Sequence, residues 1–146
     1  GLVREAQALI QDLSVLCDEG KTIFAQAELL KYSLRSIVWM IFSASGTSFD
    51  FEKFQQCYDD VMVKLYQSQF LAADEVSSQK LNESIQYLKS VVANFIRQRS
   101  ELPAAKDEKE RDMCEIITQS LNPDSNAPFS EEQKVSYLGA YLIAGY

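Results

Sequence analysis

The chain has 146 residues, a net charge of −7 and no histidine. Each of these properties limits the kinds of protein that it can be. Nucleic acids and anionic lipids are bound mainly through Lys and Arg, so the acidity argues against both as partners. The missing imidazole removes the commonest catalytic base and a common metal ligand. A chain of this length fits one domain with a sizeable core.

Apolar residues recur at spacings of three and four along most of the chain, which predicts amphipathic helices. The first helix is expected over 2–18, and Gly20 ends it because glycine adopts the left-handed conformation at little cost. The second helix is expected to begin near Thr22, so the short link predicts an antiparallel hairpin. Its last turns, 37–42, are apolar all round, so we expect that end to lie deep in a bundle or beneath another chain.

Two further helices are expected in the middle of the chain. One covers about 51–66, and the pair Thr47 and Asp50 just before it has the spacing of a capping box. The other covers about 78–99 and ends before Pro103, because proline disfavours helix in the residue that precedes it.

The remainder of the chain is less regular. The charged run 106–112 is expected to be a solvated face or a linker, and a short helix with one apolar edge follows at about 113–121. Residues 122–128 are rich in turn formers, and Ser130 with Gln133 forms a second capping box that opens a final helix.

The final helix also carries Gly139, Ala140 and Ala144, small residues that let a neighbouring backbone approach closely. Together these elements predict an all-α fold, an antiparallel (up-and-down) bundle of four main helices plus a short C-terminal helical pair. We expect a single helical domain, 1–146, with the main bundle over about 2–99 and the pair over about 104–146.

No catalytic, cofactor-binding or metal-binding residue is predicted, and no cofactor. Asn122, Asp124 and Asn126 have the spacing of a calcium-binding loop. However, Ala127 stands where that loop needs glycine and Gln133 where it needs a bidentate Glu, which favours a simple turn. A di-iron bundle needs inward-facing histidines, so the absence of histidine excludes its conventional form.

Cellular location is predicted from the cysteines and the apolar runs. Cys17, Cys57 and Cys114 are far apart and odd in number, which favours buried thiols in a reducing compartment and hence the cytoplasm; a removed N-terminal leader stays open. The run 37–42 is far shorter than the roughly 20 residues of a membrane span.

The function expected of such a bundle is a non-enzymatic protein–protein interaction module: an adaptor, a chaperone-like subunit or the helical domain of a larger protein. Its partner would be another protein or a second copy of the chain. The apolar and aromatic residues expected to form the contact surface are Trp39, Met40, Phe42, Tyr137, Tyr141 and Tyr146.

Three alternatives stay open at this point. One is a carrier that holds a small molecule or lipid in a pocket between helices. Another is an acidic inhibitor or immunity-type protein that covers a basic site, although the acidic residues are spread over both halves of the chain. The least favoured is an enzyme that uses carboxylates or Cys114.

Overall fold

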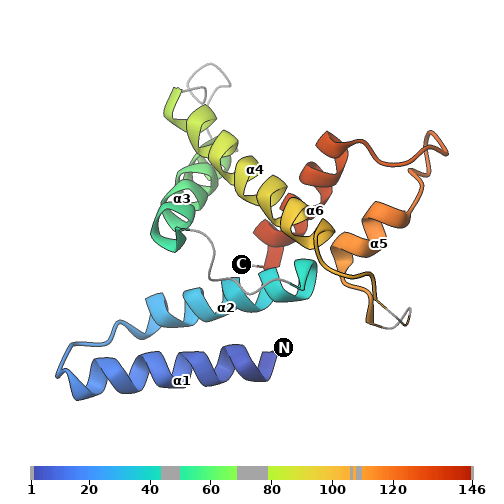
Figure 1. Ribbon diagram of the computed structural model, residues 1–146. Helices are drawn as coiled ribbons and strands as arrows, with labels where there is room; N and C mark the ends of the chain where they lie inside the picture. The colour runs from blue at the N-terminus through green and yellow to red at the C-terminus, as the bar shows by residue number, and fades with distance from the viewer. Residues whose placement is uncertain (1, 44–49, 69–78, 106, 108–109, 146) are drawn as a thin grey trace.

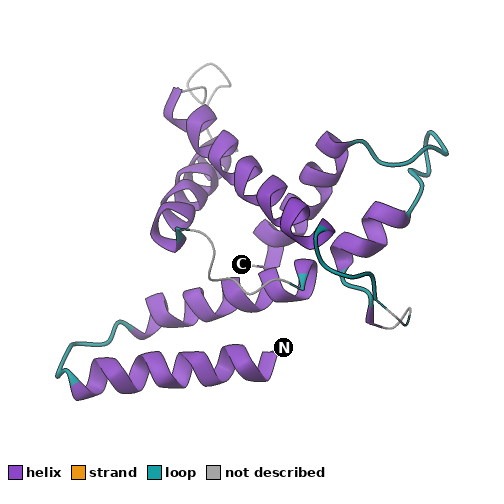
Figure 2. Ribbon diagram, viewed as in Figure 1, coloured by secondary structure: helices purple, strands orange, loops and turns teal. Residues whose placement is uncertain are grey.

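The computed structural model describes residues 2–43, 50–68, 79–105, 107 and 110–145, and within them it shows helices and no strand (Figures 1 and 2). The predicted all-α class is therefore confirmed. In chain order the helices are α1 (Leu2–Asp18), α2 (Ala25–Phe42), α3 (Phe51–Ser68), α4 (Gln79–Ser100), α5 (Met113–Gln119) and α6 (Glu131–Gly145). None of them is long and apolar enough to cross a membrane.

The first two helices form the expected hairpin and lie side by side in Figure 1. Gly20 adopts a left-handed conformation, φ 63°, and the amide of Lys21 donates to the carbonyl of Leu16 at 3.0 Å. This arrangement satisfies carbonyls at the end of α1 and reverses the chain. The second helix begins at Ala25, a few residues later than Thr22, where the sequence suggested its start.

The core lies where α2, α3, α4 and α6 meet. Phe42 and Phe95 stack in it, with their ring centroids 5.2 Å apart and their planes at 23°. The predicted burial of the apolar end of α2 is confirmed for Val38, Ile41 and Phe42. The fully or almost fully buried side chains are Leu34, Val38, Phe42, Phe54, Phe95, Leu138 and Leu142.

The last helix lies closer to the centre of the fold than a peripheral pair would. α6 packs against α2 and α4 as well as against α5, and it supplies two buried leucines, whereas α1 packs mainly against α2. A Cβ on Gly145 would lie only 2.5 Å from Cδ1 of Ile37 on α2, which explains why glycine suits that position. The strict up-and-down order of the four main helices stays a prediction.

Local caps largely follow the sequence. The Ser130 amide donates to Oε1 of Gln133 at 2.9 Å, and the Gln133 amide donates to Oγ of Ser130 at 3.2 Å, so the second capping box is confirmed. Asp50 caps α3 by accepting from the amide of Lys53 at 3.0 Å. Its proposed partner Thr47 lies outside the described residues.

Candidate functional site: an apolar pocket between three helices

A pocket of about 300 Å³ lies between α3, α4 and α6. Its inner wall contains four buried side chains, one from α3, two from α4 and one from α6: Phe54, Leu88, Val92 and Leu142. A volume of this size is at the lower end of the range for small-molecule sites, which are mostly apolar. The arrangement can therefore hold a small hydrophobic molecule.

Small residues on α6 keep this pocket open. Gly139 and Ala140 line it between the larger Val135 and Ile143, on the side of α6 that faces α4. A Cβ on Gly139 would lie 3.7 Å from Cγ2 of Val92, an ordinary contact, so a methyl group would fit without displacing its neighbour. These are small residues that the sequence suggested for close backbone packing. Here Gly139 and Ala140 also line the pocket.

One charged side chain lines the pocket. Lys89 stands on α4 between Ile85 and Val92, four and three residues away, which places all three on one face of the helix. Lys89 is exposed, and no described residue forms an ion pair or hydrogen bond with it. Its aliphatic stem can cover apolar wall while the ammonium group stays in water at the rim.

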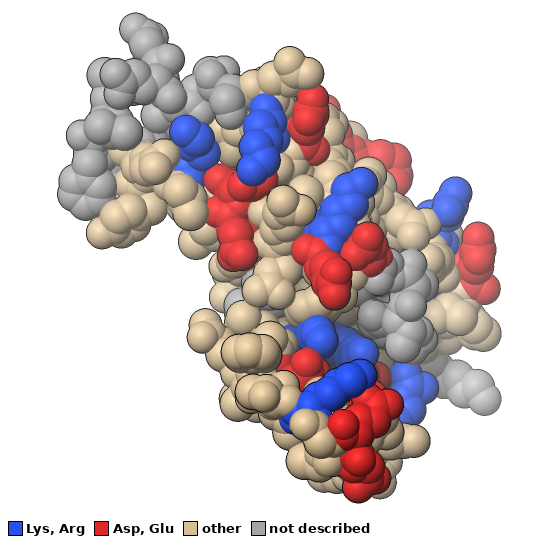
Figure 3. All heavy atoms as spheres, turned by 90° about the vertical axis from the view of Figure 1, so that its left-hand side faces the viewer, with Lys and Arg blue, Asp and Glu red and all other residues tan. Residues whose placement is uncertain are grey.

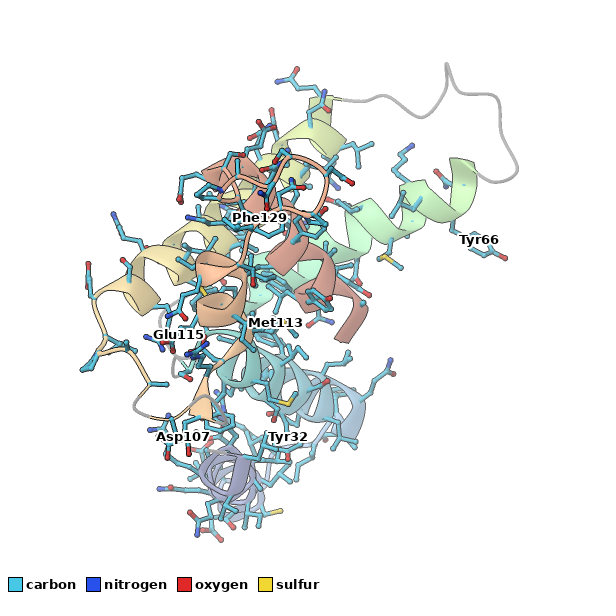
Figure 4. The ribbon with its side chains drawn as sticks, turned by 90° about the vertical axis from the view of Figure 1, so that its right-hand side faces the viewer. Tyr32, Tyr66, Asp107, Met113, Glu115 and Phe129 are labelled. Atoms are coloured by element: carbon cyan, nitrogen blue, oxygen red, sulfur yellow. The ribbon has the colours of Figure 1, made fainter. Side chains whose placement is uncertain are left out.

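A second, larger hollow, of about 400 Å³, is lined on one side by a buried cluster of ion pairs. Arg99, at the end of α4, pairs through Nε with Asp112 and through Nη2 with Oε2 of Glu115, the latter at 2.6 Å. The exposed fractions of the three side chains are 10%, 3% and 7%. In Figure 4, Glu115 lies on α5, beside the loop that carries Asp107.

The polar atoms of this cluster are well partnered. Oε1 of Glu115 accepts from the amide of Ala105 and from Nε2 of Gln119, both at 3.1 Å, while Oδ1 of Asp112 caps α5 by accepting from the Glu115 amide at 2.8 Å. The cluster therefore links α4, the following loop and α5. Its charged groups form ion pairs with one another. The predicted solvated role of run 106–112 is wrong for Asp112, which is 6% exposed.

The residues predicted to form a contact surface do not share one environment. Phe42 is not at the surface at all, because its ring is fully buried against Phe95, and this corrects its assignment. Met40, Tyr137 and Tyr141 are 44%, 47% and 49% exposed. Trp39 is half-buried, and Tyr146 lies outside the described residues.

The charges at the surface are mixed. On the face drawn in Figure 3, Lys and Arg side chains alternate with Asp and Glu side chains and form no large patch of one sign. On this face the described residues therefore offer no large acidic patch for a basic partner. The tip of α3 carries an exposed aromatic residue, Tyr66, which points away from the other helices in Figure 4.

The cysteines occupy different surroundings, and all three are free thiols. Cys17 is exposed near the end of α1, whereas Cys57 and Cys114 are buried. Burial raises the pKa of the Cys114 thiol to about 11, and the negative charge of Asp112 adds to this effect. Among the described residues no three Cys, Asp or Glu side chains gather in a group that could hold a metal ion.

The pocket residues were missed by sequence reasoning because they come from three separate helices. Phe54, Val92 and Gly139 each looked like ordinary core or packing positions on their own helix. The signal that could have found the site was a lysine, Lys89, within the apolar stripe of its helix.

No protein-family description and no curated protein matches this chain. Among solved structures, the chain is similar to one described as the crystal structure of the cytochrome P450DA heme domain, with a TM-score of 0.69 and 19% sequence identity. The similarity covers 99% of this chain but 31% of that one, so the chain spans about a third of the length of that heme domain.

This similarity corrects the predicted function. The helices are arranged like part of a heme domain and not like a free-standing interaction module, so the adaptor and chaperone-like interpretations are wrong. The carrier and acidic-inhibitor alternatives are overturned by the same finding. At 19% identity the similarity shows the fold.

Proposed function

We propose that this chain is the helical part of a heme domain with the cytochrome P450 architecture, and that its apolar pocket receives a small hydrophobic molecule. The observation that carries the proposal is the extent of the similarity, which includes 99% of the chain at a TM-score of 0.69. A shared helical hairpin or pair would cover a small fraction of the chain. Here the arrangement of nearly all the helices corresponds to an arrangement in that heme domain.

The composition of α6 supports the proposal that further parts of the same protein cover this helix. From Val135 to Gly145 this helix has no charged residue, and a helix without a polar face is typical of a fully buried position. Yet Tyr137, Ala140 and Tyr141 are exposed here. In the proposed heme domain this face of α6 is covered from within the same protein.

The cysteines, the side chains with which cytochrome P450 proteins hold heme iron, do not fit that role here. Cys114 is 2% exposed and belongs to the hydrophobic core. Cys57 is buried in the helical core, and Cys17 is exposed near the end of α1, which packs mainly against α2 and does not line the pocket. The proposal therefore places the iron ligand outside these residues, and no chemical step is assigned to this chain.

The absence of a catalytic residue of its own is part of this proposal. Its residues shape and line a pocket, and the reactive group is supplied by the heme when bound. The free thiols favour a reducing compartment, so we retain a cytoplasmic location in the proposal.

The test is the absorption spectrum of the protein purified in its natural chain context. We expect a heme Soret band, and a ferrous carbon monoxide complex with the spectrum of a thiolate-ligated heme. The triple variant Cys17→Ser, Cys57→Ser, Cys114→Ser should keep the thiolate signature if it folds. Purified protein that holds no heme, or loss of the thiolate signature in a folded Cys17→Ser or Cys114→Ser variant, would overturn the proposal.

A further inference from the structure

We propose that α5 is an opening segment of this fold: it leaves the core as a unit while α2, α3, α4 and α6 stay packed, and the ion cluster around Arg99 holds it in place. The inference goes beyond the proposed function, because it concerns a movement of the chain. Among the described residues that line the pocket between α3, α4 and α6, none belongs to α5, so the pocket walls stay in place when α5 opens.

The first step is the small apolar surface that α5 buries. The helix has seven residues, too few for an isolated helix to be stable in water. Its buried apolar side chain is Cys114, while Met113 and Ile117 are partly buried against the core. The neighbouring α6, by contrast, inserts Leu138 and Leu142 almost completely. Little hydrophobic free energy therefore keeps α5 in the core.

The second step is the hollow of about 400 Å³ beside α5. Its wall includes Ile96 and Arg97 of α4 and Thr118 and Gln119 of α5, so it lies between these two helices. Side chains that face such a gap lack the dispersion contacts that close packing provides. The contact between α4 and α5 is therefore loosely packed, and the two helices can separate there at a low cost in lost contacts.

The third step is that one guanidinium compensates both carboxylates of the cluster. Asp112 is the N-cap of α5 and Glu115 lies in its first turn, and both pair with Arg99. Without Arg99 the two carboxylates would be buried with no cation beside them, which is costly. Both stand at the start of α5, so departure of this helix returns both charges to water. Arg99 therefore controls the equilibrium between the closed and the open position of α5.

The cysteines can report this movement. Cys114 on α5 is 2% exposed, so a thiol reagent reaches it when α5 has left the core. Cys57 on α3 is buried in the part of the core that stays packed in the proposed open form. Cys17 is exposed and reports the reagent itself. The chain thus carries a reporter for the opening, a reporter for the packed core and a positive control.

The experiment is labelling with N-ethylmaleimide at neutral pH and increasing urea, on the protein in its natural chain context, with each labelled cysteine identified by mass spectrometry of its peptide. Cys17 should react at once. Cys114 should react slowly, at a rate that changes little with urea, because opening of one short helix exposes little surface. Cys57 should react with the steep urea dependence of global unfolding, measured in parallel by circular dichroism.

Three variants test the role of the ion cluster. Arg99→Met should raise the labelling rate of Cys114 in the absence of urea by about a hundredfold, which corresponds to the lower end of the range for breaking a buried ion pair. Glu115→Gln keeps the shape of the side chain and should raise the rate by about tenfold. Arg97→Met, at an exposed position two residues from Arg99, should leave the rate unchanged.

Labelling of Cys114 with the same urea dependence as global unfolding would overturn the inference, because α5 would then open only with the whole fold. Labelling of Cys57 at the same rate as Cys114 would overturn it as well. So would an unchanged Cys114 rate in folded Glu115→Gln protein, a variant that keeps the test decisive if Arg99→Met does not fold. The measurement does not involve heme, so its outcome is separate from that of the Soret measurement.

Discussion

Nη2 of Arg99 on α4 lies 2.6 Å from Oε2 of Glu115 on α5, and both side chains are buried. Thirteen residues after Arg99, Asp112 completes the cluster by accepting from Nε of the same guanidinium. Removal of one member of a buried ion cluster leaves the remaining charges without compensation. This contact is therefore where we expect a single substitution to cost the fold most.

Arg99→Met should lower the free energy of unfolding by about 3–5 kcal/mol, the range for breaking a buried ion pair from one side. Arg97→Met is the matched control, because Arg97 is exposed and contacts Asn94 on its own helix at 2.7 Å. The control should change stability by less than about 0.5 kcal/mol. Urea denaturation of the two variants measures the difference, and equal losses would show that the cluster has no special role.

Cys114 should make the protein less stable in alkaline solution. Its folded pKa is raised from 9.0 to about 11 by burial, so the unfolded chain loses this proton first. The stability that the neutral thiol contributes is complete below pH 9 and falls as the pH rises from about 9 to about 11, by about 3 kcal/mol in total.

The measurement is urea denaturation at several alkaline pH values, comparing the original chain with Cys114→Ala. The variant should lose less stability across this window than the original chain. Cys17→Ala, at an exposed position, should keep the original pH dependence. Identical slopes for the original chain and Cys114→Ala would contradict the assignment.

Two glycines of α6 should respond to alanine in opposite ways. A Cβ at Gly139 meets Val92 at an ordinary 3.7 Å, so Gly139→Ala should stabilise the helix by about 0.5–1 kcal/mol. A Cβ at Gly145 would lie 2.5 Å from Cδ1 of Ile37, so Gly145→Ala should destabilise the protein by about 1–2 kcal/mol. Thermal denaturation compares them.

A double-variant cycle tests the cause of the second effect. In an Ile37→Ala background, the two side-chain carbons that crowd position 145 are absent. Gly145→Ala should then cost less than it does in the original chain. The same cost in both backgrounds would place the strain somewhere other than against Ile37.

Two buried serines should also respond to alanine substitution in opposite ways. Oγ of Ser36 on α2 is buried and has no hydrogen-bond partner among the described residues. Oγ of Ser84 on α4 donates to Oδ2 of Asp60 at 3.3 Å. Ser36→Ala should raise the free energy of unfolding by up to about 1 kcal/mol, because it removes an unsatisfied hydroxyl and favours helix. Ser84→Ala should lower it by about 1 kcal/mol. Chemical denaturation of both variants checks the signs, and a loss of stability in Ser36→Ala would indicate a partner for its hydroxyl.

Local features of the fold could be predicted well from the sequence. The spacing of apolar residues placed the helix over Leu2–Asp18, Gly20 ended it, and Ser130 with Gln133 capped the last helix. Each of these features depends on residues within one or two turns, where hydrogen bonding and backbone conformation are set by immediate neighbours. The candidate site could not be predicted in this way. Neither the position of Lys89 in the sequence nor the chemistry of its side chain shows which helices face it.

The sequence by itself therefore determined the all-α class, most helix ends and the absence of imidazole chemistry. The tertiary structure alone decided that Phe42 is buried while Met40 is exposed, that α6 packs at the centre, and that Asp112 meets Arg99. It also decided the arrangement that resembles a heme domain. The reason is physical: an apolar or charged residue specifies that it needs a partner, and only long-range packing selects which partner it meets.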